Sequence, residues 1–167
     1  LTIDGMTVDY TAAVDSSSNT YHAFGALAGF VGNGFTAENV TVKNVTMNLN
    51  LLGEEGYAHA SFHRLPAECI GGLVGYAKGS VTLTDCNVEN LTVNVTDMND
   101  SGGTQFLIGG LIGYADALYT QIPGENEYSS SNDYYGNGSV TITGCAVSGM
   151  TVNKNHAAGA SVGGFLG

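Results

Sequence analysis

The chain has 167 residues, of which 43% are hydrophobic and only 11% are charged, and it contains 25 glycines and no tryptophan. Its 15 acidic and 4 basic residues give a formal net charge of −11, which repels the phosphates of nucleic acids and anionic lipids. Composition therefore argues for a buried core, and against disorder, a nucleic-acid partner or attachment to a membrane surface.

A seven-residue pattern, which we name block A, occurs four times along the chain. Its copies begin at Ile3, Val42, Val88 and Val147, and the third reads V-E-N-L-T-V-N. Apolar residues alternate within each half of the pattern, and one extra residue separates the halves. This spacing predicts two short strands joined by a sharp corner. The corner positions are Gly5, Asn44, Asn90 and Gly149.

A glycine-rich pattern, block B, follows each block A. Its clearest copies are I-G-G-L-V-G-Y-A from Ile70 and I-G-G-L-I-G-Y-A from Ile108. V-G-G-F-L-G from Val162 and a looser L-A-G-F-V-G from Leu27 complete the set. Glycines at fixed places indicate a tight bend or close backbone packing. No helical pattern, Lys or Ser/Thr follows in P-loop order, so a phosphate-binding loop is rejected.

A third segment precedes block A in three copies, which begin at Phe35, Val81 and Val140. The corners after it are Asn39, Asp85 and Gly144. Single-residue corners deflect the chain, whereas a hairpin needs a turn that reverses it. Repeats of a few tens of residues are typical of stacked architectures. The sequence therefore predicts an all-β fold, a right-handed parallel β-helix (β-solenoid) of about four imperfect coils with loop insertions. Each coil has three short strands and a glycine-rich return.

Stacked coils predict ladders of like residues about 4.8 Å apart. The inward ladders are Ile3, Val42, Val88, Val147; Met6, Val45, Leu91, Met150; Val8, Met47, Val93, Val152; and Val40, Cys86, Cys145. The outward ladder is Thr7, Thr46, Thr92, Thr151. In-register parallel neighbours have poor geometry for a disulfide, so we expect Cys86 and Cys145 to be free stacked thiols, with Cys69 unpaired.

We interpret residues 1–167 as a single domain, excised from a larger surface protein whose other domains adjoin it, because the chain opens and closes in mid-pattern. No segment approaches the ~20 apolar residues of a membrane span, so membrane insertion is not expected. Insertions occupy residues 10–26, 49–69, 95–107, 154–161 and 116–138. Solenoids commonly place insertions on one side, where binding resides, so residues 49–69 and 116–138 are the expected contact surfaces.

Block B followed by G-S-V-T-L-T-D-C, as in residues 70–88, resembles the GLUG motif of bacterial surface proteins. Residues 108–115 give a second match, which residues 139–147 complete after an insertion. The motif is found beside immunoglobulin-A-cleaving metallopeptidases and in Bacteroidetes surface proteins. The resemblance covers about half the chain and implies a surface-exposed, non-catalytic region that acts in adhesion or as a stalk.

Asp97, Asn99 and Ser101 are a candidate calcium site. They match the oxygen-ligand positions one, three and five of a calcium loop, and Gly102 matches position six. Position twelve carries Ile108 instead of the bidentate Glu, so the motif is incomplete and a plain polar turn is the alternative. No other cofactor is expected.

Two groups of side chains in the insertions are candidate ligand contacts. They are Tyr119, Tyr128, Tyr134 and Tyr135 in residues 116–138, and His59 and His63 in residues 49–69. Tyrosine rings suit stacking on sugars or on protein surfaces. The two histidines are spaced i, i+4, but a shared metal ion would lack a zincin-type Glu and an identified third ligand. Packing of the loops is the alternative for both groups.

The sequence therefore predicts a non-catalytic extracellular repeat module, an adhesion region or structural stalk of a bacterial surface protein, that binds through its loop insertions. The expected partner is a protein or glycan on a host or neighbouring cell. The alternative is a carbohydrate-active β-helix enzyme or a carbohydrate-binding module. Such enzymes cluster acidic residues with a basic residue on one outer sheet, whereas outward positions here are mainly Thr and Asn. No enzymatic activity is therefore expected.

Overall fold

A computed structural model describes residues 1–14, 22–53, 68–97, 105–116, 119–120, 135–136, 139–155 and 159–167. These residues form an all-β structure without a helix. No helix long and apolar enough to cross a membrane therefore occurs in the described part of the chain.

The strands fall into four successive layers, of which the second and third have the same order of elements and the first and fourth are variants of it. The first layer holds β1 (Thr2–Asp4), β2 (Thr7–Val14), β3 (His22–Gly25) and β4 (Ala28–Val31). The second holds β5 (Phe35–Glu38), β6 (Thr41–Gly53), β7 (Glu68–Gly71) and β8 (Val74–Lys78). The third holds β9 (Val81–Thr84), β10 (Asn87–Asp97), β11 (Gln105–Gly109) and β12 (Ile112–Asp116). The antiparallel pair β13 (Tyr119–Thr120) and β14 (Tyr135–Gly136) precedes the fourth, which holds β15 (Val140–Thr143), β16 (Ala146–Ser148), β17 (Thr151–Asn155) and β18 (Gly159–Gly163).

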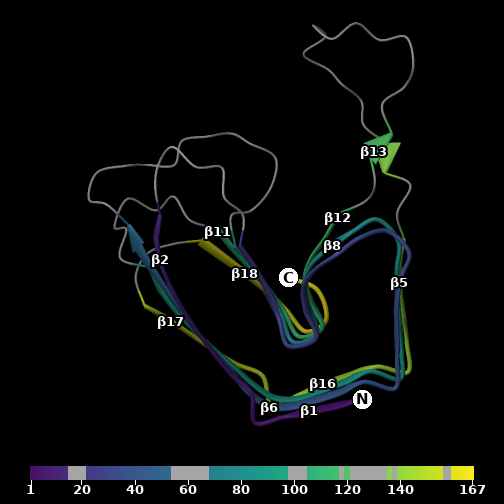
Figure 1. Cartoon of the computed structure of the whole chain (residues 1–167), viewed down its shortest axis with the longest axis horizontal. Coiled ribbons are helices and arrows are strands. Elements are labelled where there is room, and N and C mark those ends of the chain that lie inside the picture. The colour runs from purple at the N-terminus through teal and green to yellow at the C-terminus, as the bar shows by residue number, and fades with distance from the viewer. Residues whose placement is uncertain are drawn as a thin grey trace, which may run out of the picture.

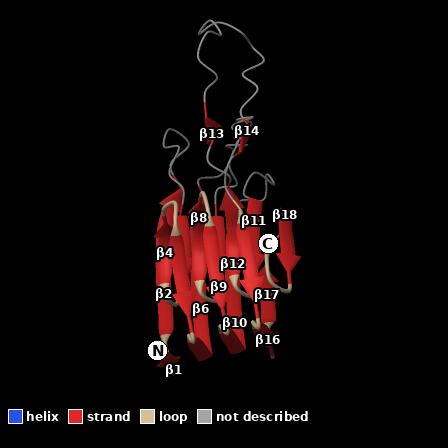
Figure 2. Cartoon of the chain, turned by 90° about the vertical axis from the view of Figure 1, so that its right-hand side faces the viewer, coloured by secondary structure: helices blue, strands red, loops and turns tan. Residues whose placement is uncertain are grey.

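Four parallel sheets join these layers. Sheet A contains β1 and β2, then β6, β10, and finally β16 and β17, and sheet B contains β3, β7, β11 and β18. Sheet C contains β4, β8 and β12, with a bridge from Ile112 to Leu166, and sheet D contains β5, β9 and β15. Equivalent strands overlie one another in Figure 1, and Figure 2 shows the layers side by side between the two termini. Each strand therefore pairs with its equivalents in the adjacent layers.

Single residues with positive φ turn the chain at the predicted corners. The non-glycine corners Asn39, Asn44, Asp85 and Asn90 have φ between 50° and 55°, and the glycine corners Gly5, Gly144 and Gly149 have φ between 65° and 72°. Asn and Asp enter this left-handed region more readily than other side chains, because their short polar groups can bond locally. All seven predicted corners are confirmed.

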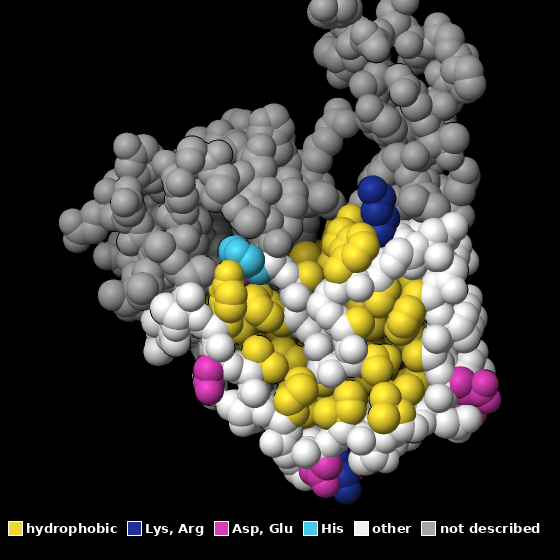
Figure 3. Space-filling view, viewed as in Figure 1, with side chains coloured by type: hydrophobic (Ala, Val, Ile, Leu, Met, Phe, Trp, Pro, Cys, Tyr) yellow, Lys and Arg dark blue, Asp and Glu magenta, His cyan; other side chains and the backbone are white. Residues whose placement is uncertain are grey.

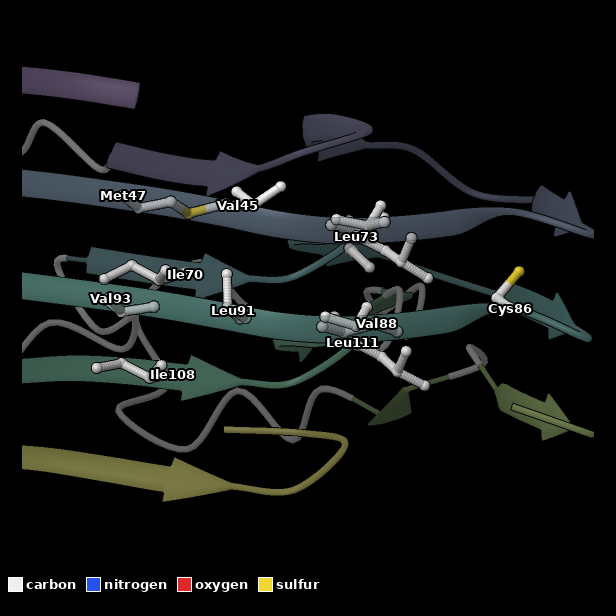
Figure 4. Close-up of a cluster of buried hydrophobic side chains, with 14 of the residues drawn as sticks. Val45, Met47, Ile70, Leu73, Cys86, Val88, Leu91, Val93, Ile108 and Leu111 are labelled. Carbon is white, nitrogen blue, oxygen red and sulfur yellow. The ribbon is translucent and has the colours of Figure 1, made fainter. Parts of the chain in front are cut away.

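The pairing register confirms the predicted ladders of sheet A. Ile3, Val42, Val88 and Val147 are in register, as are Val8, Met47, Val93 and Val152 and the outward threonines Thr7, Thr46, Thr92 and Thr151. Figure 4 shows the inward side chains of this sheet packed against Ile70, Leu73, Ile108 and Leu111. The core therefore lies inside the layers and continues from one layer to the next.

The predicted strand limits are partly wrong. β6 and β10 continue past block A to Gly53 and Asp97, and β3, β7 and β11 begin before the predicted insertions end. The continuation is stabilised by Leu49 and Val95, which pair with each other and are 1% exposed. Block B also forms two strands, such as β7 and β8, whereas the sequence predicted a single glycine-rich return segment in each coil.

The block B glycines let the turn between sheets B and C approach sheet A closely. A Cβ atom on Gly72 would lie 2.8 Å from Cγ1 of Val88 in the next layer and would collide with the carbonyl oxygen of Gly110. A Cβ atom on Gly110 would lie 2.6 Å from Cγ1 of Val147. Figure 1 shows this turn pointing into the layer. The glycines are therefore required by close backbone packing, as the sequence predicted.

The first copy of block B begins three residues earlier than the sequence predicted. Phe24 pairs with Ile70, and Ala28 pairs with Val74. This copy therefore reads F-G-A-L-A-G-F-V, and the predicted alignment from Leu27 is wrong. Ala26 stands where the other copies have the second glycine, and this difference concealed the match.

Replacement of Gly72 by alanine tests the close packing. We expect Gly72→Ala to lower the free energy of unfolding by about 3 kcal/mol, because backbone and a buried valine leave no space for the methyl group. Urea unfolding followed by circular dichroism measures this loss. Gly164→Ala is the matched control, since Gly164 has the same place in the fourth layer and a Cβ there would meet nothing within 4 Å. Equal losses in the two variants would contradict the packing argument.

The corner at Asn90 allows a second test. We expect Asn90→Val to cost about 2 kcal/mol, because a β-branched side chain is strained at positive φ and the hydrogen bond to Asn44 is lost. Asn90→Gly removes the same side chain but accepts this φ, so its loss should be smaller. The same urea titration compares the two variants, and an equal loss would exclude backbone strain as the cause.

Candidate functional site

Four insertions attach to the layers along one corner between sheets A and B. Asn50 pairs with Thr11 and with Thr96, and Thr96 pairs with Asn155, so β2, β6, β10 and β17 approach the corner in register. β3, β7, β11 and β18 leave it in register as well. The connecting segments are residues 15–21, 54–67, 98–104 and 156–158. All four insertions are therefore anchored in one row, which we name the insertion corner.

A cluster of Tyr10, His22, Phe24 and Glu68 lies at the insertion corner. Nδ1 of His22 and Oε1 of Glu68 are 2.8 Å apart, and the Tyr10 ring centroid lies 5.2 Å from that of His22 and 4.9 Å from that of Phe24. Among the described side chains, Glu68 is the one polar group that is buried, at 2% exposure. Burial of a carboxylate is costly unless it is paired, so the contact with His22 stabilises Glu68 and orients the imidazole.

Glu68 also affects the protonation of its neighbours. Burial, and second the negative charge of Glu68, raise the pKa of Tyr10 above its ordinary value. The same two causes, in the same order, raise the pKa of Cys69 from 9.0 to about 12. A nucleophilic cysteine needs a lowered pKa, because the thiolate is the reactive form. At neutral pH Cys69 is therefore an inert buried thiol.

A ladder of side-chain amides crosses the outward face of sheet A. Nδ2 of Asn48 donates to Oδ1 of Asp9 over 2.7 Å, Nδ2 of Asn94 donates to Asn48 over 2.7 Å, and Nδ2 of Asn153 donates to Asn94 over 2.8 Å. Each amide thus donates toward the preceding layer. The signal in the sequence was the repeated last position of block A, which sequence reasoning did not interpret as a ladder.

A shorter ladder of side-chain amides at the corner of sheet A also starts on an aspartate. Nδ2 of Asn90 donates to Asn44 over 3.1 Å, and Nδ2 of Asn44 donates to Oδ1 of Asp4 over 2.8 Å. Nζ of Lys43 lies 3.2 Å from Oδ2 of Asp4. The bond from Asn44, followed by the contact with Lys43, lowers the pKa of Asp4. Both amide ladders therefore start on an aspartate of the first layer.

Aromatic side chains form a strip on sheet C. The ring centroids of Phe30 and Tyr76 are 5.2 Å apart, and those of Tyr76 and Tyr114 are 5.6 Å apart with the rings 14° from parallel. The three residues hold equivalent positions in β4, β8 and β12. β12 ends at Asp116, where the fifth insertion, residues 117–138, begins. The strip therefore leads from the first layer to the base of this insertion.

The predicted contact residues fall mainly beyond what the structure describes. His59, His63, Asn99, Ser101, Tyr128 and Tyr134 lie outside the described residues. Asp97 ends β10, and Tyr119 and Tyr135 belong to the paired strands β13 and β14, but only their backbone is described. The calcium, tyrosine and histidine sites therefore stay predictions. Among the residues that the structure does describe, no three or more His, Cys, Asp or Glu side chains are grouped to hold a metal ion.

Comparison of the chain with protein-family models, with curated proteins and with solved structures gave no match. The resemblance of block B to the GLUG motif consequently stays a prediction, together with the function that it implies.

The cysteines are free, as the ladder of Cys86 and Cys145 predicted. The backbone N–H of Cys86 donates to Sγ of Cys145 over 3.3 Å, and Cys86 is fully buried whereas Cys145 is half-buried. Burial is the largest cause of the raised pKa of the Cys86 thiol. The three thiols should therefore differ in reactivity.

We expect a thiol reagent at pH 8 to label Cys145 first and to label Cys69 and Cys86 only as the protein unfolds. Cys69 keeps its proton in the folded state up to a pKa of about 12, whereas the unfolded thiol ionises near 9.0. Its contribution to stability is therefore complete below pH 9.0 and is lost as the pH rises toward 12. Mass spectrometry of labelled peptides and urea titrations of Cys69→Ala across this range check both effects. Rapid labelling of Cys69 in the folded protein would contradict them.

Proposed function

We propose that the layers form a right-handed parallel β-helix that acts as a rigid, non-catalytic scaffold for binding loops in an adhesion region or stalk of a bacterial surface protein. The observation that carries this proposal is the insertion corner, where four insertions are anchored in one row. A regular scaffold that presents irregular segments on one side is a common design of binding proteins. The molecule is one domain of a larger extracellular protein.

The repeated residues support a structural role for the layers themselves. Those of block A form the buried ladders, the corners and the amide ladders, and the glycines of block B are required for packing. Residues that recur in each layer are thus occupied by packing or turning. Specificity for a ligand is accordingly assigned to the insertions, which differ from layer to layer in sequence.

The partner is a protein or glycan on a host or neighbouring cell. Phe30 at the open end of the aromatic strip is 57% exposed, and aromatic surfaces of this kind stack on sugar rings and on apolar side chains. The strip leads to residues 117–138, which contain the four candidate tyrosines. We therefore assign contacts to this insertion with the neighbouring strip, in addition to the insertions at the insertion corner.

One observation favours the alternative, a carbohydrate-active enzyme. The hydrogen-bonded pair of His22 and Glu68 lies at the insertion corner, and the side chain of His22 is 21% exposed. A histidine oriented by a carboxylate is an arrangement used in acid–base catalysis. The two functions differ in whether a bound sugar is cleaved.

Replacement of an insertion by the shorter segment that connects equivalent strand positions in another layer tests the proposal. The equivalent of residues 117–138 in the preceding layer is Gly79, which lies between Lys78 and Ser80, so one glycine should replace the insertion without disturbing β15. We expect this variant to keep its circular dichroism and to lose binding on glycan and cell-surface protein arrays, because the contact surface is removed. A second variant, in which His156-Ala157-Ala158 replaces residues 51–66 between equivalent strand positions, tests the insertion corner in the same way. Binding that both variants retain in full would refute the loop proposal.

The same array, followed by product analysis, distinguishes the alternative. Binding without release of shorter sugars is expected for the wild-type protein. Cleavage that disappears in Glu68→Gln would instead establish the enzyme and overturn the non-catalytic scaffold.

A further inference from the structure

The outward face of sheet A beyond its corner carries a regular array of neutral polar side chains, which we name the amide face. The residues between them, such as Met47, Leu49 and Val93, point into the core and are at most 1% exposed. In Figure 1 this face is the outer side of the strands labelled β2 and β17, and no other described element lies against it. In the second and third layers, which have a layer on either side, its partly or fully exposed members are Thr46, Asn48 and Asn50 on β6 and Thr92, Asn94 and Thr96 on β10.

Hydrogen bonds between side chains fix the orientation of the amides on this face. Asn94 donates one N–H to Asn48 and accepts one from Asn153, and Asn48 in turn donates to Asp9. A side-chain amide has two N–H donors and two acceptor lone pairs. Asn48 and Asn94 therefore use one donor and one acceptor position in the ladder and keep one of each for a ligand. Because the ladder already restricts their rotamers, binding would cost little further side-chain entropy.

The charges around the amide face decide which ligands fit it. Lys43 and Glu89 occupy paired outward positions before the corner of the same two strands, and Glu38 is exposed on sheet D. Within the second and third layers the face itself is neutral, and Figure 3 shows mainly uncharged polar atoms along this outer edge. Among the described residues of the face, no Lys or Arg offers a counterion to phosphate, sulfate or carboxylate groups. No aromatic or apolar anchor, which the centre of a protein interface uses, occurs among them either.

We propose that the amide face binds a neutral polysaccharide chain that crosses successive layers. Sugar hydroxyl groups both donate and accept hydrogen bonds, as the threonine hydroxyls and the remaining amide positions of this face do. Equivalent side chains recur about every 4.8 Å from layer to layer, so repeated sugar units can make similar bonds in each layer. Contacts that are weak singly thereby add together.

This surface is separate from the insertions, and the proposal does not depend on what they recognise. The insertions differ from layer to layer and supply specificity, whereas the amide face recognises a repeat that many neutral polymers share.

Removal of two hydroxyl groups tests the site. Thr46→Val combined with Thr92→Val keeps the β-branched shape on two in-register positions and leaves the amide ladder and the insertions unchanged. We expect the affinity for soluble neutral polysaccharides, a panel of glucans, mannans and xylans, to fall by about tenfold, because two neutral hydrogen bonds are lost. Affinity electrophoresis measures this change, and circular dichroism checks that the strands persist.

The matched control is Thr36→Val combined with Thr82→Val. These threonines also pair in register and face outward in the second and third layers, but they belong to sheet D. The affinity of this control should equal that of the wild-type chain. Equal affinities of the two double variants, or a wild-type chain that binds none of the neutral polymers, would overturn the proposal.

A comparison of ligands tests the neutrality and the repetition of the site. We expect polygalacturonate to bind more weakly than the neutral polymers, and the affinity for the best neutral polymer to rise from its disaccharide to longer chains. Stronger binding of polygalacturonate would exclude a neutral ligand, and equal affinity for disaccharide and polymer would exclude a chain that crosses the layers. Since the insertions are intact in all of these proteins, either result would leave the proposed function of the insertions in place.

Discussion

The backbone of the block B turns in the second and third layers touches sheet A of the following layer, and no side chain fits between them. At Gly72 the facing groups are a carbonyl oxygen of the next turn and the methyl groups of Val88. This contact fixes how far sheets B and C fold into the layer and thereby the distance across the core. The sizes of the inward residues, with Leu73 and Leu111 both 0% exposed beside the turn, follow from that distance.

Much of this arrangement could be predicted from the sequence because it is repeated. The corners at Asn44 and Asn90 were recognisable, since a single Asn or Gly recurs where the alternation of apolar residues shifts by one. The extension of β6 and β10 past block A could not be recognised in the sequence. The ladder there contains four unlike residues, Tyr10, Leu49, Val95 and Lys154. The first block B was misplaced for the same reason, since Ala26 interrupts the glycine pair on which the alignment depended.

The candidate site was the least predictable part, and the physical reason is visible in its ladder. His22, Glu68, Phe106 and Ala160 occupy equivalent positions at the starts of β3, β7, β11 and β18, yet they share neither size nor polarity. His22 and Glu68 are 46 positions apart, and neither residue recurs at the equivalent place in the other layers, so the sequence pattern could not predict their contact. The regular pattern therefore stops where the insertions attach, and the polar pair lies among otherwise apolar neighbours.

Each layer packs mainly against the layers next to it, so the local opening of one layer need not spread through the whole stack. The two longest insertions are residues 54–67, which join β6 to β7 within the buried second layer, and residues 117–138, which run from β12 of the third layer to β15 of the fourth. Fraying of β1 or β18 would leave these anchor points in place. A partner captured by either insertion would thus meet preformed attachment sites, and little of its binding energy would be spent on ordering the scaffold.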